Sequence, residues 1–85
     1  MKYRVEIDSH ARRTFRRLPQ QTRDRILRGL QMLRDNPRPH GVVKLTDRRD
    51  AYRIRVGDYR VVYEIHDRVL LVLVIEIDHR RDVYR

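Results

Sequence analysis

The stretch from residue 51 to residue 63 decides the fold, and it reads AYRIRVGDYRVVY. Apolar and polar residues alternate on both sides of Gly57-Asp58, a dipeptide that suits a two-residue β-hairpin turn. A turn there fixes the register of the hairpin, with the expected pairs Val56–Tyr59, Arg55–Arg60, Ile54–Val61, Arg53–Val62 and Tyr52–Tyr63. Paired residues point to the same side of a sheet, and successive residues alternate sides. The hairpin therefore has one apolar and one basic face.

The two faces of this hairpin have different expected roles. The apolar face is the expected core face, formed by Tyr52, Ile54, Val56, Tyr59, Val61 and Tyr63. The other face carries Arg53, Arg55 and Arg60. Like charges placed opposite each other destabilise a sheet by ~0.2–1 kcal/mol per pair. The pattern favours an anion, such as a phosphate backbone, that neutralises the three guanidinium groups. A solvated basic face is the alternative interpretation.

The composition predicts one small basic domain spanning residues 1–85. The formal net charge is +9, and all but two of the 21 basic residues are arginines. Such a charge favours polyanionic partners, either nucleic acid or an acidic protein. The chain has no cysteine, which excludes disulfides and thiolate zinc sites. Because the histidines show no ligand spacing, we expect no metal or other cofactor.

Targeting signals are not evident in the sequence. The N-terminal segment alternates charged and apolar residues, unlike a signal peptide. The longest apolar run, Val69 to Ile75, is too short to cross a bilayer. We therefore expect a cytoplasmic protein that makes no membrane contact.

The order of expected elements is strand, helix, helix and a meander of three strands. Tyr3, Val5 and Ile7 alternate with charged residues in the first strand. Ser9 is the expected cap of the first helix, and Pro19 separates it from a second helix over 20–34. A short strand is possible at 42–45, and the last strand is expected over 69–77. The fold class is α+β, with an antiparallel two-helix hairpin on an antiparallel sheet of three C-terminal strands plus the first strand.

Four segments then resemble the RelE branch of the RelE/ParE toxin superfamily. They are Lys44-Leu45, Tyr52-Arg53-Ile54-Arg55, the hairpin segment from Gly57 to Tyr63, and the tail from His79 to Tyr84. The resemblance covers nearly the whole chain. It implies a RelE-like fold and the toxin role in a type II toxin–antitoxin pair. It further implies a ribosome-dependent endoribonuclease that cuts mRNA in the ribosomal A site and inhibits translation.

The resemblance also implies a set of site residues. The catalytic candidates are Arg53, Arg55, Arg60, Arg80 and Tyr84, and the RNA-binding candidates are Lys44, His79 and Arg81. The chain departs from the family pattern at two places. The paired basic positions are often lysine but are Arg53 and Arg55 here, and Asp78 stands where the tail motif often has glycine.

The candidate residues suit metal-independent cleavage of RNA, in which the 2′-hydroxyl attacks the adjacent phosphate. Arginines can stabilise the charge that develops on the phosphate but cannot accept a proton, since their pKa lies above ~12. Tyr84 is the better proton acceptor, because nearby guanidinium groups favour its phenolate, or it stacks on a base. Arg80 could hold the phosphate or assist the leaving group. His79 titrates in a useful range, although a hydrogen-bonded structural role is the commoner one for such a histidine.

The implied partners are a cognate antitoxin, the ribosome with its mRNA, and operator DNA reached indirectly through the antitoxin complex. The antitoxin is expected to be acidic or amphipathic and to wrap the basic domain. A ParE-like toxin that inhibits gyrase without RNase activity is the alternative function. A non-catalytic nucleic-acid-binding module is a third, and it would not need Tyr84.

Overall fold

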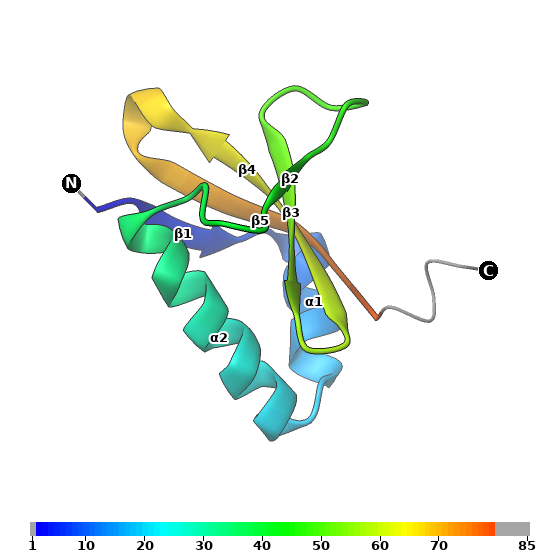
Figure 1. The fold of residues 1–85 in the computed structure, drawn as a ribbon. Coiled ribbons are helices and arrows are strands. Elements are labelled where there is room, and N and C mark those ends of the chain that lie inside the picture. The colour runs from blue at the N-terminus through cyan, green and yellow to red at the C-terminus, as the bar shows by residue number, and fades with distance from the viewer. Residues whose placement is uncertain (1, 80–85) are drawn as a thin grey trace.

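The computed structural model describes residues 2–79, which form an α+β fold (Figure 1). The elements are β1 (Arg4–Ile7), α1 (Ser9–Arg17), α2 (Gln20–Asp35), β2 (Val43–Lys44), β3 (Ala51–Val56), β4 (Tyr59–His66), a 3₁₀ turn (Asp67–Val69) and β5 (Leu71–His79). The expected fold class and order of elements are confirmed. In this described part of the chain, neither helix combines the length and apolar character needed to span a bilayer.

The five strands form one mixed sheet in the order β1-β5-β4-β3-β2. β1 runs parallel to β5, and all other neighbours are antiparallel. The two helices separate β1 from the later strands along the chain, which allows β1 to join the far edge of the meander in the parallel direction. In the strand order given above, β1 and β2 are the two edge strands.

The β3–β4 hairpin has the register that the sequence predicts, including Arg55 opposite Arg60 and Tyr52 opposite Tyr63. Gly57 has a φ of 60°, and Asp58 is not among the residues with positive φ. Glycine at the first central position is typical of a type II′ turn, whose twist matches that of the flanking strands. The hairpin tip lies beside α2, where a Cβ added to Gly57 would lie 3.4 Å from Arg25 Nη1.

One core joins the helices to a single face of the sheet. Its buried members are Ala11, Ile26, Leu30, Leu33, Tyr52, Val61, Tyr63, Ile65, Val72, Val74 and Ile77. The apolar stripe of α2 consists of Ile26, Leu30 and Leu33, whose i, i+4 and i+7 spacing puts them on one side of the helix, and each is at most 3 % exposed. Leu27, the next residue after Ile26, is 42 % exposed. The predicted apolar hairpin face also packs against this core, with Ile54, Val56 and Tyr59 partly buried.

The N-terminal cap of α1 differs from the prediction. Asp8, not Ser9, caps α1, because its carboxylate accepts a hydrogen bond from the Ala11 backbone N–H at 2.9 Å. Both residue types cap helices well, so the sequence alone did not decide between these neighbours. Pro19 occupies the cap position of α2, as expected for a residue that ends one helix and precedes another.

The last strand begins and ends two residues later than predicted, at Leu71 and His79. Val69 belongs to the preceding 3₁₀ turn and is 63 % exposed. Leu70 ends that turn in the left-handed region, with a φ of 52°. The left-handed conformation of Leu70 ends the 3₁₀ turn, so β5 begins at the next residue, Leu71.

A β-bulge in the β4–β5 pair sets the faces of β5. Val62 pairs with Glu76, whereas the next residue, Tyr63, pairs with Val74. Ile75 is therefore the extra residue of the bulge, and the side-chain alternation of β5 shifts by one there. The shift places Ile77 in the core and turns Glu76 and Asp78 to the basic face of the hairpin.

A polar network ties the chain start to two loops. Arg38 donates to both carboxylate oxygens of Asp67, at 3.2 and 2.8 Å, and Tyr3 donates to the same carboxylate at 2.5 Å. The Arg38 guanidinium also lies 5.3 Å from the centroid of the Tyr52 ring. The buried Tyr63 hydroxyl donates to the Pro37 carbonyl oxygen at 2.8 Å. These contacts hold the α2–β2 connection against the sheet.

Candidate functional site

The basic face of the hairpin, defined by Arg53, Arg55 and Arg60, is present as the sequence predicts. Arg55 and Arg60 pair directly across the two strands, and Arg53 pairs with Val62 on the same face. Arg55 is exposed, whereas Arg53 and Arg60 are half-buried. Val62, in the middle of this face, is only 4 % exposed. The arginines therefore lie on a partly covered surface.

None of these three arginines is neutralised by a carboxylate within residues 2–79. The ion pairs there are Lys2–Asp35, Arg4–Glu6, Arg38–Asp67 and His66–Glu64. The Nε atom of Arg60 is buried and has no hydrogen-bond partner in the described structure. A buried donor left unpaired costs ~1–3 kcal/mol, so this atom calls for a ligand or another partner. An anion such as phosphate would fill that role.

Two carboxylates border the basic face on β5. Asp78 pairs with Arg60 in the sheet register, and Glu76 pairs with Val62. Burial raises the pKa of Glu76, and the charge of Asp78 and a hydrogen bond with it raise that pKa further. Sequence reasoning noted Asp78 but missed Glu76, because without the bulge Glu76 would belong to the core face.

Two predicted RNA-binding residues lie on the opposite side of the sheet. Lys44 pairs with Tyr52 and His79 pairs with Tyr59, so both share the register of the core face. The His79 ring packs edge-on against Tyr59, with centroids 4.9 Å apart and planes at 87°. His79 thus makes a ring contact on the core side of the sheet. The structure does not bring Lys44 or His79 to the three arginines.

The remaining predicted residues, Arg80, Arg81 and Tyr84, lie outside the described residues. Glu64 also lies on the basic face, opposite Ala51. It contacts His66, with Oε1 2.9 Å from Nε2, rather than an arginine. Within residues 2–79, no group of three or more potential metal ligands lies together.

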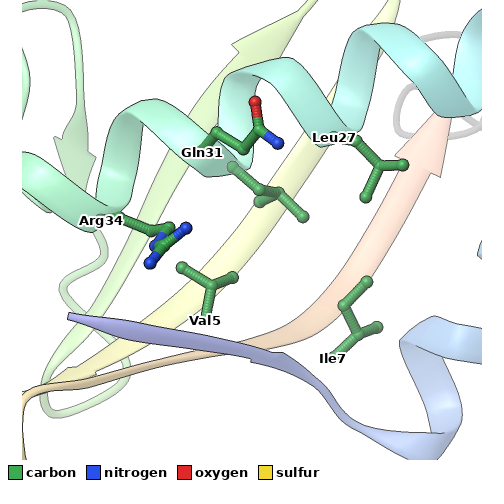
Figure 2. Close-up of a pocket in the computed structure, with 6 residues that line it drawn as sticks. Val5, Ile7, Leu27, Gln31 and Arg34 are labelled. Atoms are coloured by element: carbon green, nitrogen blue, oxygen red, sulfur yellow. The ribbon is translucent and has the colours of Figure 1, made fainter. Parts of the chain in front are cut away.

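An apolar hollow lies on the other side of the molecule, between α2 and the edge strand β1. It has a volume of about 200 Å³ and is lined by Val5, Ile7, Leu27, Leu30, Gln31 and Arg34. Figure 2 shows Val5 and Ile7 rising from β1 toward α2, with Leu27 and Arg34 at the two ends. The exposed Leu27 side chain is part of the lining of this hollow.

Comparison with known proteins places this fold in a family. A family model described as "ParE toxin of type II toxin-antitoxin system, parDE" matches residues 2–84. The chain belongs to the RelE/ParE toxin family. It is thus a toxin of the type II toxin–antitoxin class.

Individual relatives in this family are RelE-type toxins. Toxin RelG of Mycobacterium tuberculosis is 29% identical over 86 residues, which cover 100% of this chain and 99% of that protein. The RelE–RelB complex of Pyrococcus horikoshii superposes with a TM-score of 0.83 at 30% identity, covering 94% of this chain and 97% of that one. The toxin–antitoxin complex RelBE2 of M. tuberculosis gives 0.81 at 27% identity, covering 94% and 93%. The resemblance seen in the sequence is confirmed.

Proposed function

We propose that this RelE/ParE-family toxin is a ribosome-dependent endoribonuclease that cleaves mRNA in the ribosomal A site and so inhibits translation. The observation that carries the proposal is the basic face, where three arginines share one surface without an ion pair among the described residues. The unpartnered Arg60 Nε supports a role in anion binding. The proposed toxin domain spans residues 1–85.

The proposed chemistry needs no metal. The 2′-hydroxyl of the RNA attacks its adjacent phosphate, and Arg53, Arg55 and Arg60 stabilise the negative charge that develops there. Planar guanidinium groups suit this task because each can donate two hydrogen bonds to phosphate oxygens. Among the tail residues, Arg80 is proposed to hold the phosphate, Arg81 to bind RNA, and Tyr84 to accept a proton or stack on a base.

A gyrase-inhibiting, ParE-like activity is the second candidate. It is favoured by the description of the matching family model, which names ParE. The gathered arginines favour the nuclease, since inhibition by binding alone requires no phosphate-stabilising centre. The RelE-type names of the individual relatives point the same way.

We further propose that a cognate antitoxin neutralises this toxin and that the complex contacts operator DNA through the antitoxin. Support comes from the two relatives whose structures are complexes, one described as RelE–RelB and one as toxin–antitoxin. A net charge of +9 suits an acidic partner, and the hollow between α2 and β1 offers apolar surface to an amphipathic segment.

The test is a parallel assay of cleavage and supercoiling. Purified toxin is added to ribosomes programmed with mRNA and, in parallel, to gyrase with relaxed plasmid. The proposal predicts mRNA cut at a fixed position in the A-site codon, with normal supercoiling. Intact mRNA with blocked supercoiling would establish the ParE-like alternative, and intact mRNA with normal supercoiling would leave a non-catalytic binder.

A further inference from the structure

We propose that Glu76 on β5 is the proton acceptor for the attacking 2′-hydroxyl and that Asp78 positions it. This inference rests on the proposed endoribonuclease function, adds a residue to its site and leaves Tyr84 the second of its two proposed roles, stacking on a base. The proposed cleavage needs such a group, because the three arginines of the basic face cannot accept a proton.

The sheet geometry brings the carboxylates and the arginines together. One row across three strands is formed by Arg55, Arg60 and Asp78 on β3, β4 and β5. The adjacent row is formed by Arg53, Val62 and Glu76. Neighbouring strands lie ~5 Å apart, so Glu76 and Asp78 border the position where a phosphate held by the arginines would lie. The site has a cationic side on β3 and an acidic side on β5.

This arrangement depends on the bulge at Ile75. Regular alternation would turn Glu76 into the core beside Val74, where an unpaired carboxylate is costly. The bulge moves Ile77 inward in its place and presents Glu76 on the basic face. Bulges often re-aim a side chain next to an active site.

The two carboxylates are not used to neutralise the arginines. Arg60 faces Asp78 in the register, yet no ion pair within 4.0 Å joins them among the described residues. The buried Arg60 Nε also has no hydrogen-bond partner there. Glu76 interacts with Asp78 instead. Both the arginines and the carboxylates thus remain available to a substrate.

The surroundings of Glu76 suit a general base. Burial and the neighbouring Asp78 raise its pKa, while the charges of Arg48 and His10 lower it. On this side of the sheet β4 presents two charged residues, Arg60 and Glu64. A carboxylate with a raised pKa is a stronger base than an ordinary one and therefore accepts the 2′-proton more readily.

The proposed step balances as follows. The Glu76 carboxylate takes the proton of the 2′-hydroxyl while the 2′-oxygen forms a bond to phosphorus. The bond between phosphorus and the 5′-oxygen breaks, and its electron pair stays on the 5′-oxygen, which takes a proton from water. The products are a 2′,3′-cyclic phosphate and a 5′-hydroxyl. The Glu76 carboxyl then returns its proton to solvent.

The test measures single-turnover cleavage on programmed ribosomes as a function of pH for the wild type, Glu76→Gln, Asp78→Asn and Tyr84→Phe. Glu64→Gln is the matched control, since Glu64 lies on the same face but contacts His66. With a carboxylate base, the wild-type rate rises tenfold per pH unit at acid pH and then levels off. Glu76→Gln should lower the rate about 100-fold and remove the acid limb, without weakening ribosome binding. Asp78→Asn should move that limb to lower pH, because the pKa of Glu76 falls when the neighbouring charge is removed.

Three results would overturn the assignment. Wild-type rates in Glu76→Gln would exclude Glu76 as the acceptor while leaving the endoribonuclease function intact. A rate that keeps rising through alkaline pH and loses this rise in Tyr84→Phe would identify Tyr84 instead. Absence of cleavage by the wild type would refute the endoribonuclease function, and the role of Glu76 with it.

Discussion

Arg55 and Arg60 face each other across the β3–β4 hairpin, and neither forms an ion pair with any residue between 2 and 79. Two opposed cations lower the stability of a sheet. Because the chain keeps both arginines despite this cost, we infer that the pair has a role other than stabilising the fold. Binding of an anion accounts for the pair, because it neutralises both guanidinium groups.

Replacing Arg55 with Gln should therefore stabilise the fold. Removal of one like charge is expected to raise the free energy of unfolding by ~0.2–1 kcal/mol at low salt. The gain should shrink in 1 M NaCl, where exposed charges are screened. Urea unfolding measures the free energy of unfolding at low salt and in 1 M NaCl. Arg68→Gln, at an exposed arginine of the 3₁₀ turn, controls for the loss of net charge. If Arg55→Gln is no more stable than Arg68→Gln, the repulsion between Arg55 and Arg60 is refuted.

Asp67→Asn should change how stability depends on pH. Hydrogen bonds from Arg38 and Tyr3 lower the pKa of Asp67 to about 2 in the folded protein. Its unfolded pKa is ~3.9, so its contribution is present above pH ~4 and is lost as the pH falls toward 2. The wild-type free energy of unfolding should drop across that window, and the variant should drop less. Urea titrations between pH 2 and 5 measure this, with Asp24→Asn as an exposed control. Parallel wild-type and Asp67→Asn profiles would contradict the assigned ion pair.

Gly57→Ala should destabilise the hairpin. The φ of 60° at Gly57 is in the left-handed region, where a Cβ costs ~1–2 kcal/mol. Gly57→Asn should cost less, since Asn tolerates this conformation better than Ala. The ranking glycine, asparagine, alanine in urea-unfolding stability is the expected result. Equal stability of all three proteins would indicate that the turn has a different conformation.

The hairpin could be predicted from sequence because two signals agree there. Alternation with a period of two fixes the faces, and Gly57-Asp58 fixes the turn, so the pairing of Arg55 with Arg60 follows. The helix stripe of Ile26, Leu30 and Leu33 was predictable for the same reason, since its spacing separates buried from exposed positions.

The faces of β5 could not be predicted. The run from Val69 to Ile75 is apolar at every position, so it contains no information about which residues point to the core. The bulge at Ile75 then reverses the alternation. This is why Glu76 was missed. His79 was a candidate through the family resemblance of the tail, and its ring packs on Tyr59 on the other face.

The most direct test of the account is the single-turnover rate of mRNA cleavage by Arg60→Ala on programmed ribosomes. Arg68→Ala, at an exposed arginine outside the basic face, serves as the matched control. Loss of one group that stabilises the developing phosphate charge should slow cleavage by about 10²–10³-fold, while the control retains the wild-type rate. Cleavage by Arg60→Ala at the wild-type rate would contradict the claim that this arginine face binds the reacting phosphate.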